Sequence, residues 1–266
     1  MALKIGIVGC GAIGKSLAKY IIQDLSGKAV LSALYDLDRK QSSLISKRLT
    51  VGTLRELIKK SDLVIESASG KSAFAIAKPA LENGKDVMIM SVGGVLDRFS
   101  QLERIARAKH ARIFIPSGAL AGIDGLKASM ISKIKKAVLT TYKNPLSFQG
   151  VKYVADKKIN LAKIKKDKVL FFGPAAQAVK YFPQNINVAA VLALAGIGKE
   201  KTKVKIVASP RAKRNIHEIL VESNAGLVRA RTENVLHPDN PKTSFLAVLA
   251  AAATLKQISE SARIGT

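Results

Sequence analysis

Three closely spaced glycines are the first residues whose types suggest chemistry. They follow the apolar run of residues 4–8 and precede residues 15–22, whose apolar positions have helical spacing. A strand, a glycine turn and a helix in this order are typical of a phosphate-binding unit, because glycine lets a pyrophosphate approach the main chain. The phosphates would lie at the helix N-terminus, where free N–H groups favour an anion. The predicted dinucleotide contacts of this turn are Gly9, Gly11, Ala12, Ile13 and Gly14.

An acidic residue follows the next strand at the distance that a dinucleotide site needs. Asp36 comes directly after the apolar residues 29–35 and would accept hydrogen bonds from an adenosine ribose. Its carboxylate would repel a 2′-phosphate, whereas Arg39 could reach toward one. We therefore predict NAD as the cofactor, with NADP tolerated. A glycine-rich turn without a ligand is the alternative at this point.

The elements that position these residues alternate along the first half of the chain. Short helices are predicted over residues 54–60, 72–83 and 98–109, and strands over residues 63–66, 86–90 and 112–116. This alternation indicates an α/β fold with a Rossmann-type, doubly wound parallel sheet. Ser67 and Ala68 follow one of these strands at the carboxyl edge of the sheet, so we predict that they also contact the cofactor.

The pattern changes after Pro116, where a glycine-rich junction occupies residues 117–125. Strand-like segments at residues 137–142, 203–208 and 215–221, with an apolar helix at residues 187–194, predict a second, α+β domain. A last helix over residues 243–261 is expected to return to the first domain. The predicted boundaries are residues 1–117, completed by 241–266, for the dinucleotide-binding domain, and 118–240 for the substrate and catalytic domain.

Composition limits the class of protein. The formal charge is +25 in 266 residues, and only Asp156 and Asp167 oppose the lysines of residues 127–168. Such a charge attracts polyanions and anionic substrates, but Tyr142, Phe148 and Tyr153 are too scattered for a stacking platform, so nucleic-acid binding is not expected.

The sequence shows no pattern of a secreted, membrane-spanning or metal-binding protein. One cysteine excludes a disulfide framework, and we see neither a signal peptide nor a membrane span. A cytoplasmic protein is predicted, without a metal site.

Several motifs together resemble the signature of the L-aspartate dehydrogenase family. They are FGPAAQAVKYFPQNINVAA at residues 172–190, the Leu194-Ala195-Gly196 that follows, Pro116-Ser117-Gly118-Ala119, Gly122-Ile123-Asp124, Ile216-His217-Glu218 and Asn240-Pro241-Lys242-Thr243-Ser244. The likeness runs from Lys4 to the final helix. Phe172 departs from it, because an acidic residue is usual at that position.

The resemblance implies an activity and residues for it. The activity is the NAD(P)-dependent oxidative deamination of L-aspartate to iminoaspartate, then to oxaloacetate and ammonia, with a possible role in NAD biosynthesis. The family's nicotinamide contacts fall on Ala121 and Asn187, and its catalytic histidine on His217. An imidazole with an unperturbed pKa of about 6.5 would suit a general base. The junction residues Ser117 and Gly118 are candidate substrate contacts.

The residues alone leave some of these roles open. His217 shares a strand face with Ile219 and Val221, so it also fits a buried core histidine. Asn187 also fits a helix N-cap, for which Asn185 competes.

Other functions also remain open. One alternative is a related two-domain dehydrogenase with another small substrate, although Ser91-Val92-Gly93-Gly94 stands where sugar dehydrogenases carry Glu-Lys-Pro. Another is a nucleotide- or nucleic-acid-binding protein that is not an enzyme. We expect a homodimer with a small dicarboxylate substrate, and the groups that bind the two carboxylates are not identified.

Overall fold

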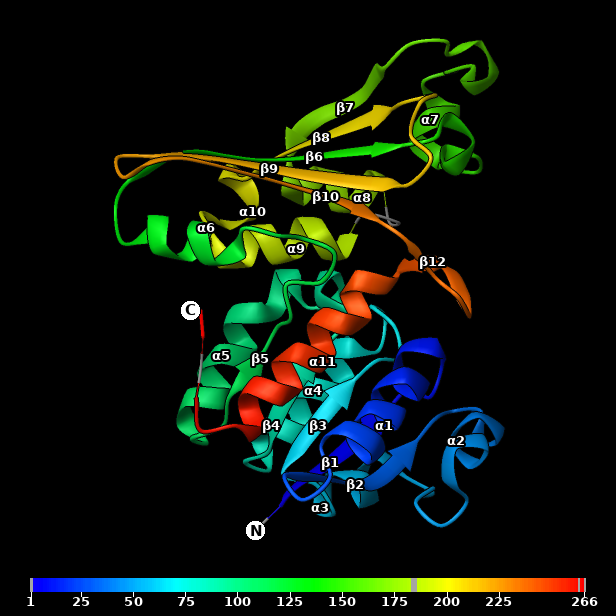
Figure 1. Ribbon diagram of the computed structural model, residues 1–266, viewed down its shortest axis with the longest axis vertical. Coiled ribbons are helices and arrows are strands. Elements are labelled where there is room, and N and C mark those ends of the chain that lie inside the picture. Colours follow the sequence, from blue (N-terminus) through cyan, green and yellow to red (C-terminus); the bar gives the residue numbers. More distant parts are fainter. Residues whose placement is uncertain (1, 183–185, 263, 266) are drawn as a thin grey trace. The chain divides into compact units, whose positions relative to one another are not determined.

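The computed structural model describes residues 2–182, 186–262 and 264–265 (Figure 1). The chain divides into two compact units. The first comprises Met1–Pro116 and Val248–Arg263, and the second comprises Ser117–Ala247 and Ile264–Thr266.

The first unit contains a five-stranded parallel sheet with the order β2-β1-β3-β4-β5. Its strands are β1 (Leu3–Val8), β2 (Ala29–Tyr35), β3 (Leu63–Glu66), β4 (Asp86–Ile89) and β5 (Ile113–Phe114). The strand order changes direction between β1 and β3, which is where sheets of this kind bind ligands beyond their carboxyl ends. The predicted Rossmann-type parallel sheet is therefore confirmed.

Helices cover both faces of this sheet. They are α1 (Ala12–Asp24), α2 (Arg39–Ser46), α3 (Leu54–Lys59), α4 (Ala73–Glu82), α5 (Phe99–Ala108) and α11 (Phe245–Ser259), with the short 3₁₀ turns η1 (Val92–Gly94) and η2 (Leu96–Arg98). Ile5 and Ile7 of β1 pack in one core with Leu17 of α1 and Leu255 of α11. Another core joins α3, α4 and α5 to the sheet. As predicted, the last helix returns to the first unit.

The second unit contains a mixed sheet with the order β10-β9-β6-β8-β7. Its strands are β6 (Ile134–Lys143), β7 (Lys168–Pro174), β8 (Lys203–Ala208), β9 (Asn215–Ser223) and β10 (Gly226–Asn234). Only the β6–β8 pair among them is parallel. The two-stranded β11 (Leu236–His237) and β12 (Asn240–Ser244) stand apart from this sheet.

One face of this sheet is covered by helices, as Figure 1 shows. They are α6 (Ile123–Met130), α8 (Ala175–Tyr181), α9 (Ile186–Ala195) and α10 (Gly198–Lys201). The β6–β7 connection contains η3 (Pro145–Phe148), α7 (Lys152–Asp156) and η4 (Leu161–Lys163). Within the described residues, no helix has the length and apolar character needed to cross a membrane.

The aromatic residues of the second unit are less scattered than expected. Tyr153 lies 5.2 Å from Phe182 between ring centroids, and Phe148 lies 6.2 Å from the same ring. Phe171 and Tyr181 complete the cluster. Phe148 and Tyr153 therefore lie in one cluster, whereas Tyr142 does not belong to it. Because Phe148 and Phe182 are buried, the cluster is a small core and not a stacking platform.

Candidate functional site

The glycine turn has the geometry that its sequence predicts. Gly9 has a φ of +90°, and a Cβ there would lie 2.5 Å from the backbone nitrogen of Ala68. A Cβ on Gly14 would collide with the carbonyl oxygen of Gly9. Gly11 differs from both, because among the described residues no atom beyond its chain neighbours lies within 4 Å of the position that its Cβ would take. It also precedes α1 as an N-cap without a side-chain capping bond. An anionic ligand can therefore approach the main chain at Gly11, at the first turn of α1 that contains Ala12 and Ile13.

Asp36 is held against this turn. Its Oδ2 accepts a hydrogen bond of 2.7 Å from the backbone N–H of Cys10, and its Oδ1 accepts one of 2.9 Å from that of Asp38. Each carboxylate oxygen retains a second lone pair, so the group can still accept from the hydroxyls of a ribose. Arg39 begins α2 three residues farther on.

The loop after β3 lies directly on the turn. Ser67 Oγ donates a hydrogen bond of 2.7 Å to the carbonyl oxygen of Gly9. The structure thus places Ser67 and Ala68 beside Gly9 and Gly14, at the carboxyl edge of the sheet.

Glu66 is a structural residue of this edge that the sequence did not identify. Its side chain is wholly buried and accepts bonds of 2.9 Å from the backbone N–H groups of Ala68 and Ser91. Burial raises the pKa of Glu66, and these N–H groups oppose the rise. The carboxylate therefore joins the loops that follow β3 and β4. The available signal was a charged residue ending an otherwise apolar strand.

Cys10 does not contribute reactive chemistry to the turn. Burial, together with the charge of Asp36, raises the pKa of Cys10 to about 12. The thiol remains protonated and is a poor nucleophile. No group of three or more histidine, cysteine, aspartate and glutamate residues that could hold a metal occurs in the described ranges.

His217 lies in β9 of the second unit and is only 6% exposed. Its Nδ1 is 3.0 Å from Thr141 Oγ1 in the neighbouring strand β6. Burial, and to a smaller extent the positive charge of Lys143, lower the pKa of His217 from 6.5 to about 3. The expectation of an unperturbed pKa is wrong, because it took no account of burial. The imidazole is neutral at physiological pH.

The strand register connects His217 to the glycine-rich junction. His217 is paired with Thr141 on one side and with Thr232 of β10 on the other. Thr232 Oγ1 donates a bond of 2.8 Å to the carbonyl oxygen of Ala119. The junction containing Ser117, Gly118 and Ala121 is therefore attached to the strand next to His217. Gly118 has a φ of +67°, and Ala121 is exposed just before α6.

Asn187 is exposed and is the second residue of α9. Because α9 begins at Ile186, the interpretation of Asn187 as the N-cap is wrong. The competing cap, Asn185, lies outside the described residues.

Lys143 is the residue of this region that the sequence missed. It ends β6, two positions after Thr141, and is 6% exposed. Burial lowers its pKa from 10.5 to about 8. The available signal was its position, because Lys143 continues the alternating buried positions of β6. Its neighbour His217 is distant in sequence, so the sequence did not indicate that the two lie together.

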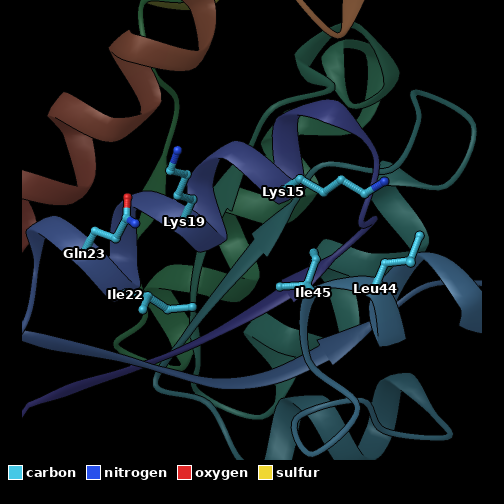
Figure 2. Close-up of a pocket in the computed structure, with 6 residues that line it drawn as sticks. All are labelled: Lys15, Lys19, Ile22, Gln23, Leu44 and Ile45. Atoms are coloured by element: carbon cyan, nitrogen blue, oxygen red, sulfur yellow. The ribbon is translucent and has the colours of Figure 1, made fainter.

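A hollow between α1 and α2 is separate from these residues. It has a volume of about 480 Å³, and Figure 2 shows the six side chains that line it: Lys15, Lys19, Ile22, Gln23, Leu44 and Ile45. Lys15 Nζ donates to Gln41 Oε1 at 3.0 Å. Neither the glycine turn nor Asp36 lines this hollow, so we do not assign it to the nucleotide site.

Comparisons with known proteins identify relatives for both units. The family model described as "Aspartate dehydrogenase, C-terminal" matches residues 124–258, and that described as "Homoserine dehydrogenase, NAD binding domain" matches residues 9–116. The chain is 44% identical to the L-aspartate dehydrogenase of Methanosarcina barkeri, over 99% of this chain and 100% of that one. It is 43% identical to that of Methanococcoides burtonii, with the same coverage.

Solved structures agree on the fold. The crystal structure of aspartate dehydrogenase from Thermotoga maritima has a TM-score of 0.77 and 27% identity, and each chain covers 100% of the other. A homoserine dehydrogenase from Thiobacillus denitrificans has a TM-score of 0.65 at 13% identity, over 97% of this chain and 73% of that one, which is a similarity of fold alone.

Proposed function

Because the chain belongs to the L-aspartate dehydrogenase family, we propose that it oxidises L-aspartate with NAD(P) as the hydride acceptor. The observation that carries the proposal is the 44% identity over nearly the whole of both chains. L-aspartate loses a hydride from Cα and a proton from its amine and becomes iminoaspartate. Water then adds to the imine, and loss of ammonia leaves oxaloacetate. Iminoaspartate is also a possible precursor for NAD biosynthesis.

The residues of the first unit fit a dinucleotide. The open position at Gly11 accommodates a pyrophosphate at the start of α1, and Asp36 presents a carboxylate beside the same turn. NAD, when bound, supplies the hydride acceptor. Asp36 supports a preference for NAD over NADP, since a 2′-phosphate would meet its negative charge. We propose that Ala12, Ile13, Gly14, Ser67 and Ala68 complete this half of the site, and that Ala121 and Asn187 contact the nicotinamide end.

His217 is the proposed general base. If the Thr141 hydroxyl accepts the proton on Nδ1, the imidazole keeps a free lone pair on Nε2. That nitrogen takes the proton of the water that attacks the imine. Ser117 and Gly118 are proposed substrate contacts, and their attachment through Ala119 to Thr232 supports this assignment.

The assay that tests this function follows nicotinamide reduction with each common L-amino acid in turn. We expect turnover with L-aspartate and stoichiometric release of oxaloacetate and ammonia. Turnover restricted to another amino acid or to an alcohol would contradict the proposal, as would nicotinamide reduction without ammonia.

We also propose a homodimer in the cytoplasm. The exposed apolar side chains of Val169 and Phe172 on β7 support a protein interface. A single buried cysteine is compatible with a reducing compartment. Sedimentation velocity distinguishes a dimer from a monomer.

A further inference from the structure

Lys143 is a buried cation without an anionic partner. Its side chain is 6% exposed, and within the part of the chain that the structure describes no carboxylate forms an ion pair with it. Burial is the cause of its lowered pKa, with no opposing negative charge. Proteins rarely bury an ammonium group unless a counter-ion compensates for its lost hydration. The packing of the fold does not explain why the ammonium group of Lys143 is buried without a counter-ion.

The surroundings of Lys143 are those of the proposed catalytic histidine. Side chains two positions apart on a strand point to the same face, so Lys143 lies on the same face of β6 as Thr141. Thr141 is paired directly with His217 of β9 and hydrogen-bonded to it. The charge of Lys143 acts on the imidazole of His217. Ammonium, hydroxyl and imidazole groups thus gather at one place on the buried face of this sheet.

We propose that Lys143 binds a carboxylate of the substrate and so holds a dicarboxylate beside His217. The inference rests on the proposed function for the identity of that substrate, because L-aspartate brings two carboxylates and the sequence analysis identified no group that binds either. The bound carboxylate would be the missing counter-ion of the buried ammonium. A charge-assisted hydrogen bond to a side chain this deeply buried is strong, so the lysine would contribute both affinity and orientation.

Carboxylate binding has a consequence for His217. The positive charge of Lys143 disfavours protonation of the imidazole in the free protein. A carboxylate paired with Lys143 neutralises that charge, so the pKa of His217 rises when the substrate binds. The base would then accept a proton more readily in the presence of substrate than in its absence.

The test measures binding of succinate, a dicarboxylate that has no amine to oxidise. Isothermal titration calorimetry compares the wild type with Lys143→Met, with saturating NAD present. We expect about 100-fold weaker succinate binding in the variant, because the bound carboxylate then lacks its buried cationic partner. Lys136→Met is the matched control, since Lys136 lies on the same strand and is exposed, and it should bind succinate as the wild type does.

Thermal denaturation shows whether Lys143→Met is folded. If Lys143 binds the substrate and does not stabilise the fold, Lys143→Met removes an uncompensated buried charge and should leave Tm unchanged or raise it. A lower Tm would indicate a structural role. Should Lys143→Met not fold, Lys143→Gln serves for the same titration. Succinate binding within threefold of the wild type in a folded variant would overturn the inference, and so would wild-type protein that does not bind succinate.

Turnover of L-aspartate separates this inference from the proposed function. In Lys143→Met, KM for L-aspartate should rise by about 100-fold, and kcat should fall less. A wild type active on L-aspartate, with a KM that does not depend on Lys143, contradicts the inference alone. A wild type inactive on L-aspartate that still binds succinate through Lys143 contradicts the proposed function alone.

Discussion

His217 is both a buried core residue and the proposed general base. It is buried, it is paired with Thr141, and it lies among the apolar residues of its strand face. The same burial that makes it a core residue keeps its imidazole neutral, but a pKa of about 3 also makes it a weaker base than a free histidine. A substrate carboxylate that neutralises Lys143 would raise this pKa and restore part of the basicity.

Replacement of His217 by asparagine separates these two roles. We expect His217→Asn to lower kcat by about 10²- to 10⁴-fold, because the amide keeps polarity but cannot accept a proton as a base. NAD affinity should be unchanged, since the proposed nucleotide contacts of Gly11 and Asp36 are in the first unit. Steady-state kinetics and calorimetry with NAD measure the two effects.

His110→Asn is the matched control for this experiment. His110 is exposed and has a φ of +54°, a conformation that asparagine tolerates. It should keep wild-type kcat. Near-normal turnover in His217→Asn would mean that His217 only packs.

The pKa of His217 also predicts how stability depends on pH. The pKa is about 3 in the folded protein and about 6.5 in the unfolded chain, so between these values the unfolded chain binds more protons. The contribution of His217 to stability is complete above pH 6.5 and is lost as the pH falls toward 3. Urea unfolding at pH 7 and pH 4.5 should show a smaller loss of stability in His217→Asn than in the wild type. An equal loss in both proteins would argue against this pKa.

At the scale of elements, the glycine turn joins β1 to α1 by two different uses of glycine. Position 9 requires glycine because its φ is positive and because the loop after β3 lies against it. At position 11, glycine leaves a space that no neighbouring side chain fills. The first is a requirement of the fold and the second is a requirement of the ligand.

Alanine should therefore affect stability at position 9 and NAD binding at position 11. Gly9→Ala should lower the free energy of unfolding by about 1–3 kcal/mol, since a Cβ there is strained and meets Ala68. Gly11→Ala should leave stability nearly unchanged and weaken NAD binding by about tenfold or more, because its Cβ would occupy the path of the pyrophosphate. Thermal unfolding and NAD titration of both variants check this. Equal NAD affinity in Gly11→Ala and the wild type would show that the ligand does not approach there.

The elements themselves could be predicted from the sequence, but their lateral pairing could not. Residues 63–65 are an apolar run that is followed by Glu66 and a polar loop, and this pattern identifies β3 without any structure. Thr141 and His217 are 76 residues apart, and no local pattern specifies their register. Lys143 was missed for that reason, and so was the low pKa of His217. The role of Glu66 depends likewise on two loops that come together only in the folded sheet.

At the scale of the whole molecule, the charge of +25 is the property that the site does not explain. A field of one sign raises the encounter rate of a dianionic substrate over distances of about the Debye length. This attraction acts before binding and is weakened by salt.

We expect kcat/KM for L-aspartate to fall about threefold between low and moderate ionic strength, as the Debye length drops below about 10 Å. The value of kcat at saturating L-aspartate should change little, because encounter no longer limits the rate. Kinetics over a series of salt concentrations test this. A flat kcat/KM would mean that the charge does not steer the substrate.

The return of α11 has a consequence for the order in which the chain acquires its structure. Val248, Ala251 and Leu255 share a core with Leu17 and Ile21 of α1, near the other end of the sequence. During synthesis these residues of α11 are made after the rest of the unit, so until then the core that α1 shares with β1 and β2 is incomplete. The second unit consists almost entirely of the continuous segment Ser117–Ala247 and meets no such delay. We therefore expect the amino-terminal unit, although its first strands are made first, to complete its core after the second unit.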